Sequence, residues 1–176
     1  MSDAILAPYD PAWADAFAAM QAVYTSALAG AILGIEHVGS TAIPGLWAKP
    51  ILDIDIVMPD YAAFPQVVEA LGLLGYTHHG DQGIVHREVF KTHDSAAPYT
   101  EPRHNWMRHH LYVCPAQSEE LQRHVRFRDV LRTREDLRRE YEQIKHDIAR
   151  RSHGDRKIYA QIKETECRAF VERVLG

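Results

Sequence analysis

The sequence predicts a single α/β domain, in which a small mixed β-sheet is flanked by an N-terminal helix and a C-terminal helical bundle. Three observations lead to this fold class. The apolar run from Ile51 to Met58 has the length and composition of a buried strand. Large apolar residues recur at three- and four-residue spacing in residues 11–30, which is typical of an amphipathic helix. Helical spacing returns in residues 118–174 and continues almost to the end of the chain.

Strands and helices alternate in the first part of the chain. Asp10 can cap the first helix, and Pro11 suits its first turn. A second helix is predicted from about residue 62 and ends before Gly75, because glycine favours the backbone that terminates a helix. Residues 92–105 contain two prolines and no periodicity, which predicts an irregular loop. Short runs with strand character are residues 32–38, 51–58, 76–79, 85–91 and 108–114.

The last third of the chain is predicted to be helical, with Ser118 as the cap of its first helix. The expected helices are residues 118–132, 135–151 and 155–174. Twelve of the twenty Lys and Arg residues lie between Arg123 and Lys157, interleaved with Asp and Glu. Most of them should therefore lie on solvated helix faces. We expect one domain over residues 1–176, with its sheet-containing core up to about residue 115 and its helical part from about residue 116.

Composition limits the class of protein. With 176 residues, of which 46% are hydrophobic and 25% charged, the chain can bury an ordinary core without metal or disulfide staples. A net charge of -4 argues against a strongly nucleic-acid-binding surface, so we expect no duplex-DNA partner. Cys114 and Cys167 form no C-x-x-C pair, which favours a reducing compartment. Because no signal-peptide pattern or long apolar run is present, we expect a cytoplasmic protein without a membrane partner.

Two carboxylates interrupt the apolar run, and they are the strongest functional signal. Side chains alternate along a strand, so Asp53 and Asp55 should share one face while the apolar residues occupy the other. Two like charges on a buried strand need a partner, and a divalent cation with oxygen ligands would satisfy both. Magnesium is the natural candidate. The alternative is a structural ion pair or a strand end that reaches solvent.

A Gly39-Ser40-Thr41 turn precedes the carboxylates. Glycine lets the backbone approach a phosphate closely, and hydroxyl and N–H groups at a helix start can hold phosphate oxygens. The alternative is a plain turn in which Ser40 or Thr41 only caps a short helix. Lys49 would either neutralise phosphate or pair with one of the aspartates.

These motifs together resemble a known family. A hydrophobic residue, Gly39 and Ser40, followed after twelve residues by Asp53-Ile54-Asp55, resembles the signature of the nucleotidyltransferase superfold. The fuller segment HVGSTAIPGLWAKPILDIDIVM resembles the GrpB family, a branch of that superfold found alone or fused to the C-terminal side of dephospho-CoA kinase. The resemblance covers most of the chain and extends to His110-Leu111, to FRDVLR at residues 127–132 and to Tyr141, Lys145 and Lys163.

The resemblance implies a nucleotidyltransferase-like fold and transfer of a nucleoside monophosphate from a nucleoside triphosphate. The acceptor would be a small molecule, a protein or an RNA end. Asp53 and Asp55 would be the catalytic and metal-binding residues, holding Mg²⁺ or Mn²⁺. The expected substrate-binding residues are Gly39, Ser40, Thr41, Lys49, His110, Arg128 and Lys145. For Arg128 and Lys145 a structural salt bridge is an equal alternative.

The sequence also departs from this pattern. Many nucleotidyltransferases carry a third carboxylate on a neighbouring strand, whereas residues 108–114 contain no Asp or Glu, and Glu88 is a weaker candidate. This favours a first alternative, a non-catalytic module that binds a nucleotide or CoA precursor or assists the folding of a partner. A second alternative is a metal-dependent phosphohydrolase. Its support is a cluster of histidines from which His104, His109 and His110 would form a metal-binding trio.

Overall fold

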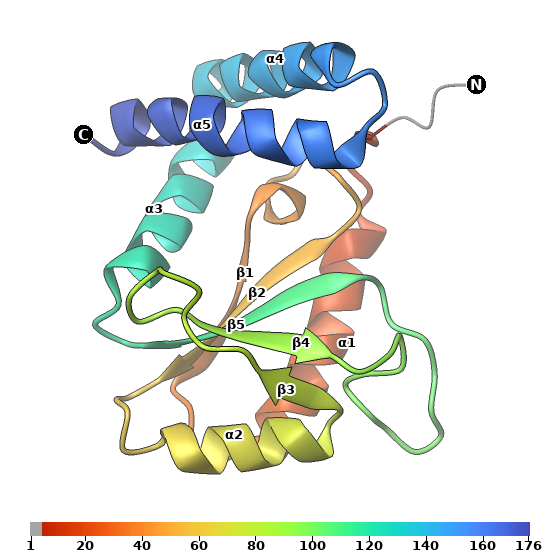
Figure 1. Cartoon of the computed structure of the whole chain (residues 1–176), viewed down its shortest axis with the longest axis vertical. Helices are drawn as coiled ribbons and strands as arrows, with labels where there is room; N and C mark the ends of the chain where they lie inside the picture. Colours follow the sequence, from red (N-terminus) through yellow and green to blue (C-terminus); the bar gives the residue numbers. More distant parts are fainter. Residues whose placement is uncertain (1–4) are drawn as a thin grey trace.

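A five-stranded mixed sheet in the order β1-β2-β5-β4-β3 lies at the centre of the molecule (Figure 1). The computed structural model describes residues 5–176. Strands β2 and β5 run parallel, and the other neighbouring pairs are antiparallel. The strands are β1 (Gly34–Val38), β2 (Leu52–Met58), β3 (Tyr76–His78), β4 (Glu88–Thr92) and β5 (His109–Pro115).

Helices α1 (Ala12–Ala27) and α2 (Phe64–Leu73) pack against one face of the sheet. The four residues of β2 that point to this face are Leu52, Ile54, Ile56 and Met58, and all are fully buried. Met20 and Tyr24 of α1 and Val67 and Leu71 of α2 complete this core. The alternation predicted for β2 therefore buries its apolar side chains beneath two helices and leaves its other face for the carboxylates.

The opposite face is covered unevenly. Helix α3 (Glu119–Thr133) contacts β1 and carries the chain toward α4 (Glu135–Arg151) and α5 (Arg156–Leu175), which lie side by side (Figure 1). The three helices share a second core that includes Leu131, Tyr141, Ile148, Tyr159 and Phe170. Ile43 and Leu46, from the connection between β1 and β2, belong to this helical core. The connection that carries the Gly-Ser turn is thus clamped by the C-terminal helices.

The predicted α/β fold class is confirmed, with a mixed sheet between an N-terminal helix and a C-terminal helical part. The strand expected over residues 85–91 begins only at Glu88, because residues 84–87 form turns in which His86 has a φ of 62°. The loop before β5 is irregular, as expected, and is braced by a hydrogen bond of 2.8 Å from Trp106 Nε1 to the carbonyl of Pro98. Within residues 5–176, no helix is both long and apolar enough to cross a membrane.

Candidate functional site

Asp53 and Asp55 project from the face of β2 that α1 and α2 leave uncovered. The register of the parallel pair places His110 of β5 beside Asp53, and Tyr112 beside Asp55. The two carboxylates differ in exposure, since the Asp53 side chain is 32% exposed and that of Asp55 is 0% exposed. Asp53 therefore faces the open part of the site, and Asp55 forms its floor.

His124 of α3 covers Asp55. Its Nδ1 lies 2.7 Å from Asp55 Oδ2, and its Nε2 lies 3.2 Å from Glu120 Oε1. Burial alone lowers the pKa of His124, but the hydrogen bonds with Asp55 and Glu120 outweigh burial and raise this pKa to about 10. His124 is therefore an imidazolium at neutral pH and supplies part of the positive charge that the carboxylate pair requires. Asp55 Oδ1 is buried without a hydrogen-bond partner among residues 5–176.

The Gly-Ser turn contacts Asp53 directly. Gly39 has a φ of 72° and a ψ of -173°, a conformation that is essentially restricted to glycine. A Cβ atom at Gly39 would lie 2.3 Å from Asp53 Oδ2, so the missing side chain also creates the space for the carboxylate. Ser40 then begins the short helix η1 (Ser40–Ala42). The turn and the carboxylate strand are packed as one unit.

Thr41 points inward. Its Oγ1 lies 3.0 Å from His37 Nε2 and donates a hydrogen bond of 3.3 Å to the carbonyl of Ile51. Burial lowers the pKa of His37 to about 4, so this imidazole is neutral and can donate to the Thr41 hydroxyl. The Thr41 side chain is occupied by protein partners and braces the turn, and we therefore leave Thr41 out of the phosphate-binding set.

Lys145 of α4 reaches the other side of the turn. Its ammonium donates to the carbonyl of Trp47 and lies 3.4 Å from Ser40 Oγ. Burial lowers the pKa of Lys145 to about 7, and the nearby charge of Lys163 acts in the same direction. Within residues 5–176 no carboxylate forms a salt bridge with the Lys145 ammonium. The approach of an anion near Ser40 would therefore favour the protonated form of Lys145.

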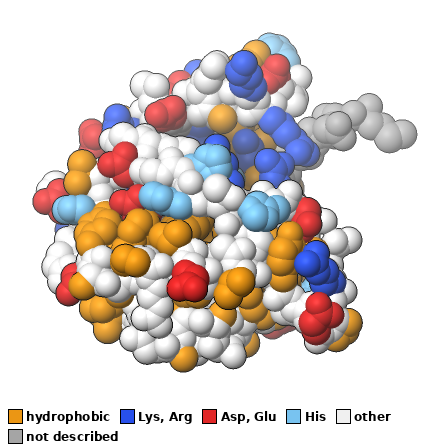
Figure 2. All heavy atoms as spheres, turned by 60° about the horizontal axis from the view of Figure 1, so that its bottom comes forward, with side chains coloured by type: hydrophobic (Ala, Val, Ile, Leu, Met, Phe, Trp, Pro, Cys, Tyr) orange, Lys and Arg blue, Asp and Glu red, His pale blue; other side chains and the backbone are white. Residues whose placement is uncertain are grey.

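Lys49 belongs to the same basic region. Its ammonium lies 4.4 Å from the ring centroid of Tyr159, and within residues 5–176 no salt bridge joins it to Asp53 or Asp55. Burial lowers the pKa of Lys49, as do the charges of Lys163, Arg156 and Arg108. We call Lys49, Arg108, Lys145, Arg156 and Lys163 the cationic cluster. Figure 2 shows Lys and Arg side chains gathered in a recess of the surface. Of the two alternatives for Lys49, this placement favours phosphate over an aspartate.

Arg128 has a structural position. Its Nη1 donates to Glu36 and, at 3.0 Å, to the carbonyl of His37, and its Nε donates to Asp129 Oδ1 at 2.8 Å. These bonds attach α3 to β1 and use most of the guanidinium donors. For Arg128 the geometry therefore favours the salt-bridge alternative over phosphate binding.

Glu88 cannot supply the third carboxylate. It pairs with Val113 in the β4–β5 register, so its side chain points to the sheet face that α1 and α2 cover. There it lies 2.7 Å from His78 Nε2 and accepts a hydrogen bond of 2.8 Å from Tyr61. His110 occupies the position beside Asp53 where a third carboxylate would lie. Its Nδ1 lies 3.0 Å from Asp53 Oδ1.

The histidine trio is not assembled. His109 and His110 are consecutive residues of β5, so they point to opposite faces of the sheet. His109 is 2.7 Å from the Tyr76 hydroxyl on the core side, and the ring of His104 packs against Trp106. The expectation of a histidine-dominated metal site is wrong for this geometry, because alternation along β5 separates two of its three members.

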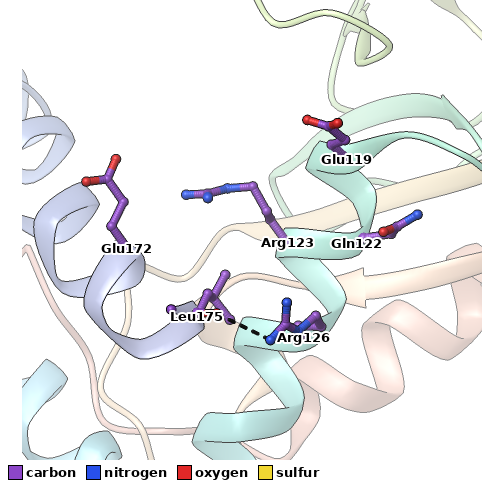
Figure 3. Close-up of a pocket in the computed structure, with 7 residues that line it drawn as sticks. Glu119, Gln122, Arg123, Arg126, Glu172 and Leu175 are labelled. Carbon is purple, nitrogen blue, oxygen red and sulfur yellow. Dashed lines mark hydrogen bonds between the residues drawn. The ribbon is translucent and has the colours of Figure 1, made fainter.

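Hollows lie beside the helices and along the open sheet face. A groove of about 780 Å³ runs along β4 and β5 and reaches His110 and Tyr112. A smaller hollow of about 370 Å³ lies between α3 and the C-terminal end of α5, where Arg126 donates a hydrogen bond of 3.3 Å to the carbonyl of Leu175 (Figure 3). The smaller hollow contains none of the predicted site residues.

The donor set fits a magnesium ion. Mg²⁺ commonly binds one or two protein carboxylates and takes its other ligands from phosphates and water. Asp53 is accessible, and the unpartnered Oδ1 of Asp55 is the kind of buried oxygen that a cation would satisfy. In the described chain no group of three or more His, Cys, Asp or Glu side chains is arranged to hold a metal ion, so phosphates and water would have to complete the coordination.

Sequence reasoning missed two residues of this site, His124 and Arg87. The signal that could have found His124 is its i,i+4 spacing from Glu120, which is typical of a paired acid and base. Arg87, whose guanidinium carbon lies 4.8 Å from the Tyr112 ring centroid, comes from a turn and had no sequence signal. Both His124 and Arg87 reach Asp55 or its neighbours only through the tertiary fold.

Comparison with known proteins adds relatives and a fold. The UPF0157 protein PA4798 of Pseudomonas aeruginosa is 40% identical over 170 residues, which is 96% of this chain and 65% of that protein. A dephospho-CoA kinase of Mycolicibacterium paratuberculosis is 27% identical over 186 residues, with 90% of this chain and 43% of that protein covered. The chain therefore spans less than two thirds of either relative.

Two solved structures share the fold. The crystal structure of the conserved protein GrpB from Enterococcus faecalis has a TM-score of 0.77 at 24% identity and covers 97% of both chains. Cid1 in complex with its short product ApU has a TM-score of 0.53 at 12% identity, over 79% of this chain and 42% of that one. The fold is thus nucleotidyltransferase-like. A sequence model described as GrpB protein matches residues 3–174, nearly the whole chain. The chain belongs to the GrpB family.

Proposed function

We propose that the protein transfers a nucleoside monophosphate from a nucleoside triphosphate to an acceptor oxygen, with Mg²⁺ or Mn²⁺ as the cofactor. The observation that carries this proposal is the packing of Gly39 against Asp53, which is so close that a Cβ added to Gly39 would lie only 2.3 Å from Asp53 Oδ2. A phosphate-binding turn and a carboxylate strand in direct contact would hold a triphosphate and its cation at adjacent points. The nucleotidyltransferase-like fold supports the same conclusion.

The triphosphate would lie between the turn and the cationic cluster. Ser40 Oγ and the backbone N–H groups at the start of η1 provide donors, and Lys145 lies 3.4 Å from the same hydroxyl. The charge of Lys163 lowers the pKa of both Lys49 and Lys145, so Lys163 repels each of these lysines in the absence of an anion. Binding of phosphate would offset this mutual repulsion, and we expect it to raise the pKa of Lys145.

The transfer step forms one bond and breaks one. The acceptor oxygen bonds to the α-phosphorus, while the bond from the α-phosphorus to the bridging oxygen of the β-phosphate breaks and pyrophosphate leaves with the electron pair. An acceptor hydroxyl loses its proton to water. Mg²⁺ held by Asp53 and by Oδ1 of Asp55 would reduce the charge on the phosphates and help to orient them. The Asp53 carboxylate is partly exposed, and the ion pair with His124 holds Asp55 in place beneath it.

A non-catalytic binding module is the second candidate, and one observation favours it. The place beside Asp53 that would accommodate a third carboxylate contains His110, and His124 already neutralises Asp55. Such a module would bind a nucleotide or a CoA precursor without turnover, or assist the folding of a partner. One relative of this chain is a dephospho-CoA kinase, which makes CoA precursors a reasonable part of any ligand panel.

The test separates binding from turnover. Thermal unfolding is recorded with each nucleoside triphosphate and with CoA precursors, with and without Mg²⁺, because a ligand of the native state raises the melting temperature. We expect a Mg²⁺-dependent rise for at least one triphosphate. Asp53→Asn should abolish this rise and keep the fold, whereas the exposed control Asp15→Asn should preserve it.

Turnover is followed as release of pyrophosphate from the triphosphate that binds. Release that depends on Mg²⁺ and on Asp53 supports nucleotidyl transfer. Binding without pyrophosphate release in the presence of a broad acceptor mixture would support the binding module instead. If no triphosphate shifts the melting temperature, or if Asp53→Asn binds as the wild type does, the proposed role of the carboxylates is refuted.

A further inference from the structure

The groove along β4 and β5 opens on the carboxylate side of the sheet. His110 and Tyr112 of β5 lie beside Asp53 and Asp55 in the register, and Val89 of β4 pairs with Tyr112 on the same face. All three line the groove, whose volume is about 780 Å³. The Gly-Ser turn lies on the opposite, β1 side of β2, because it follows Val38, which pairs with Asp53, and the helical core clamps it there. The groove therefore lies on the β5 side of the carboxylates and the turn on their β1 side, and Arg108 of the cationic cluster also lines the groove.

The charges of the groove are mostly positive. Arg87, Lys91 and Arg108 line it, and the only carboxylate among its described lining residues is Asp94. Asp94 is engaged within its own loop, where it accepts hydrogen bonds from the backbone of Ala96 at 2.8 Å and from the Tyr99 hydroxyl at 3.1 Å. Within residues 5–176 no salt bridge neutralises any of the three cations. An anionic ligand would complete this set.

Arg87 is the residue best placed to bind such a ligand. Its guanidinium packs over the ring of Tyr112, 4.8 Å from the centroid, which restricts its orientation. Its Nε is buried and has no hydrogen-bond partner in the described chain. An oriented guanidinium with an unused donor suits a phosphate group, because phosphate oxygens accept two parallel N–H bonds.

We propose that this groove binds the acceptor of the transfer reaction, and that the acceptor is a small phosphorylated molecule. Arg87 and Lys91 would hold its phosphate, while its nucleophilic oxygen would lie near His110 and Asp53. The volume of the groove is in the range of small-molecule sites, and the net charge of -4 disfavours a long polyanion. The role as acceptor site rests on the proposed function, but the binding of an organic phosphate does not.

Calorimetric titration without metal or triphosphate tests the groove alone. The probes are inorganic phosphate, ribose 5-phosphate and a 5′-phosphorylated RNA tetranucleotide. We expect ribose 5-phosphate to bind to the wild type and Arg87→Gln/Lys91→Gln to weaken it at least about tenfold, because two charge-assisted contacts are lost. Arg139→Gln/Arg168→Gln removes two exposed charges from α4 and α5 and should leave the affinity unchanged.

A second variant tests whether ribose 5-phosphate binds in the groove or at the cationic cluster. Lys49→Gln alters the cationic cluster and should change the affinity for ribose 5-phosphate less than about twofold, while it weakens the binding of a triphosphate. If the double variant of Arg87 and Lys91 does not fold, the exposed Lys91→Gln alone should still weaken ribose 5-phosphate several-fold.

Three results would overturn the proposal. They are the absence of binding by ribose 5-phosphate, equal binding by the groove variant and the wild type, and groove-dependent binding of the RNA tetranucleotide alone, which would make the acceptor an RNA end. Because the triphosphate experiment with Asp53→Asn is read separately, failure of the groove leaves the proposed transfer function standing. Conversely, if ribose 5-phosphate binds in the groove but no triphosphate binds, the proposed transfer function is contradicted and the groove stands as a phosphate-binding site.

Discussion

The contact between Gly39 and Asp53 can be tested by adding a single methyl group. Gly39→Ala forces alanine into a backbone conformation that costs about 1–3 kcal/mol for a residue other than glycine. It also places the new Cβ 2.3 Å from Asp53 Oδ2 and 3.0 Å from Asp53 Cγ, so the carboxylate must rotate away from its position. We therefore expect the free energy of unfolding to fall by about 3 kcal/mol, combining about 2 kcal/mol of backbone strain with about 1 kcal/mol of side-chain displacement.

Gly30→Ala is the control for a positive φ without a clash. Gly30 has a φ of +82°, yet none of the described residues has an atom within 4 Å of its added Cβ, so this variant reports backbone strain without the clash. For a chain of this size about 1 kcal/mol lowers the melting temperature by roughly 2–4 °C. On that scale we expect a loss of about 6–12 °C for Gly39→Ala, against about 4–8 °C for Gly30→Ala. Calorimetry gives both values.

Triphosphate binding also distinguishes Gly39→Ala from Gly30→Ala. Displacement of Asp53 should abolish the Mg²⁺-dependent shift with triphosphate in Gly39→Ala, whereas Gly30→Ala should retain it. Adding Asp53→Ala to Gly39→Ala removes the two nearest clashing atoms and should recover part of the lost stability, which a double-mutant cycle measures. If Gly39→Ala is no less stable than Gly30→Ala and still binds triphosphate, the packing of the turn against the carboxylate is not what holds the site.

Two further predictions concern cations of the C-terminal helices. The pKa of Lys145 is lowered to about 7 by burial, so between pH 7 and about 10 the unfolded chain binds more protons than the folded one, and stability rises with pH. From pH 7 to pH 9 the free energy of unfolding should rise by about 2 kcal/mol, because the slope reaches about 1.4 kcal/mol per pH unit only once the folded Lys145 is deprotonated. Urea unfolding of the wild type and of Lys145→Met at both pH values should show that the variant lacks this rise. A pH response that is the same in both proteins would refute the burial of an ionisable Lys145. Arg128→Gln breaks the bonds from α3 to Glu36 and His37, and should cost about 2 kcal/mol of stability while leaving triphosphate affinity unchanged in calorimetric titration. If Arg128→Gln has normal stability but binds triphosphate poorly, Arg128 is a phosphate-binding residue and not a structural one.

Local pattern was sufficient for the fold class and for the placement of the carboxylates on one face. Alternation along β2 buries Leu52, Ile54 and Ile56 and turns Asp53 and Asp55 to the other side, and that relation depends only on strand geometry. Helical periodicity likewise anticipated α3, α4 and α5 to within a residue or two. Boundaries were less certain where a turn replaced strand, as at residues 84–87, because a short apolar pattern does not reveal a positive φ.

The partners of each charge were decided by the tertiary structure. His124 is 69 residues from Asp55 in sequence, and only the packing of α3 across the sheet brings the imidazole onto that carboxylate. The register of β4 against β5 sends Glu88 to the core side, away from the position of a third carboxylate. Arg128 and Lys145 were equivalent from sequence, but one is paired with Glu36 and the other lies buried beside Ser40.

The sequence by itself therefore determined the α/β fold class and the presence of two carboxylates and a Gly-Ser turn near one another on the chain. It could do so because strand alternation, helical spacing and turn chemistry are local properties of the backbone. Only the tertiary structure decided which of the basic residues are neutralised and that Arg87 faces an open groove. The physical reason is that the partner and the burial of a charge depend on side chains from distant segments, and those are set by how the helices and strands pack.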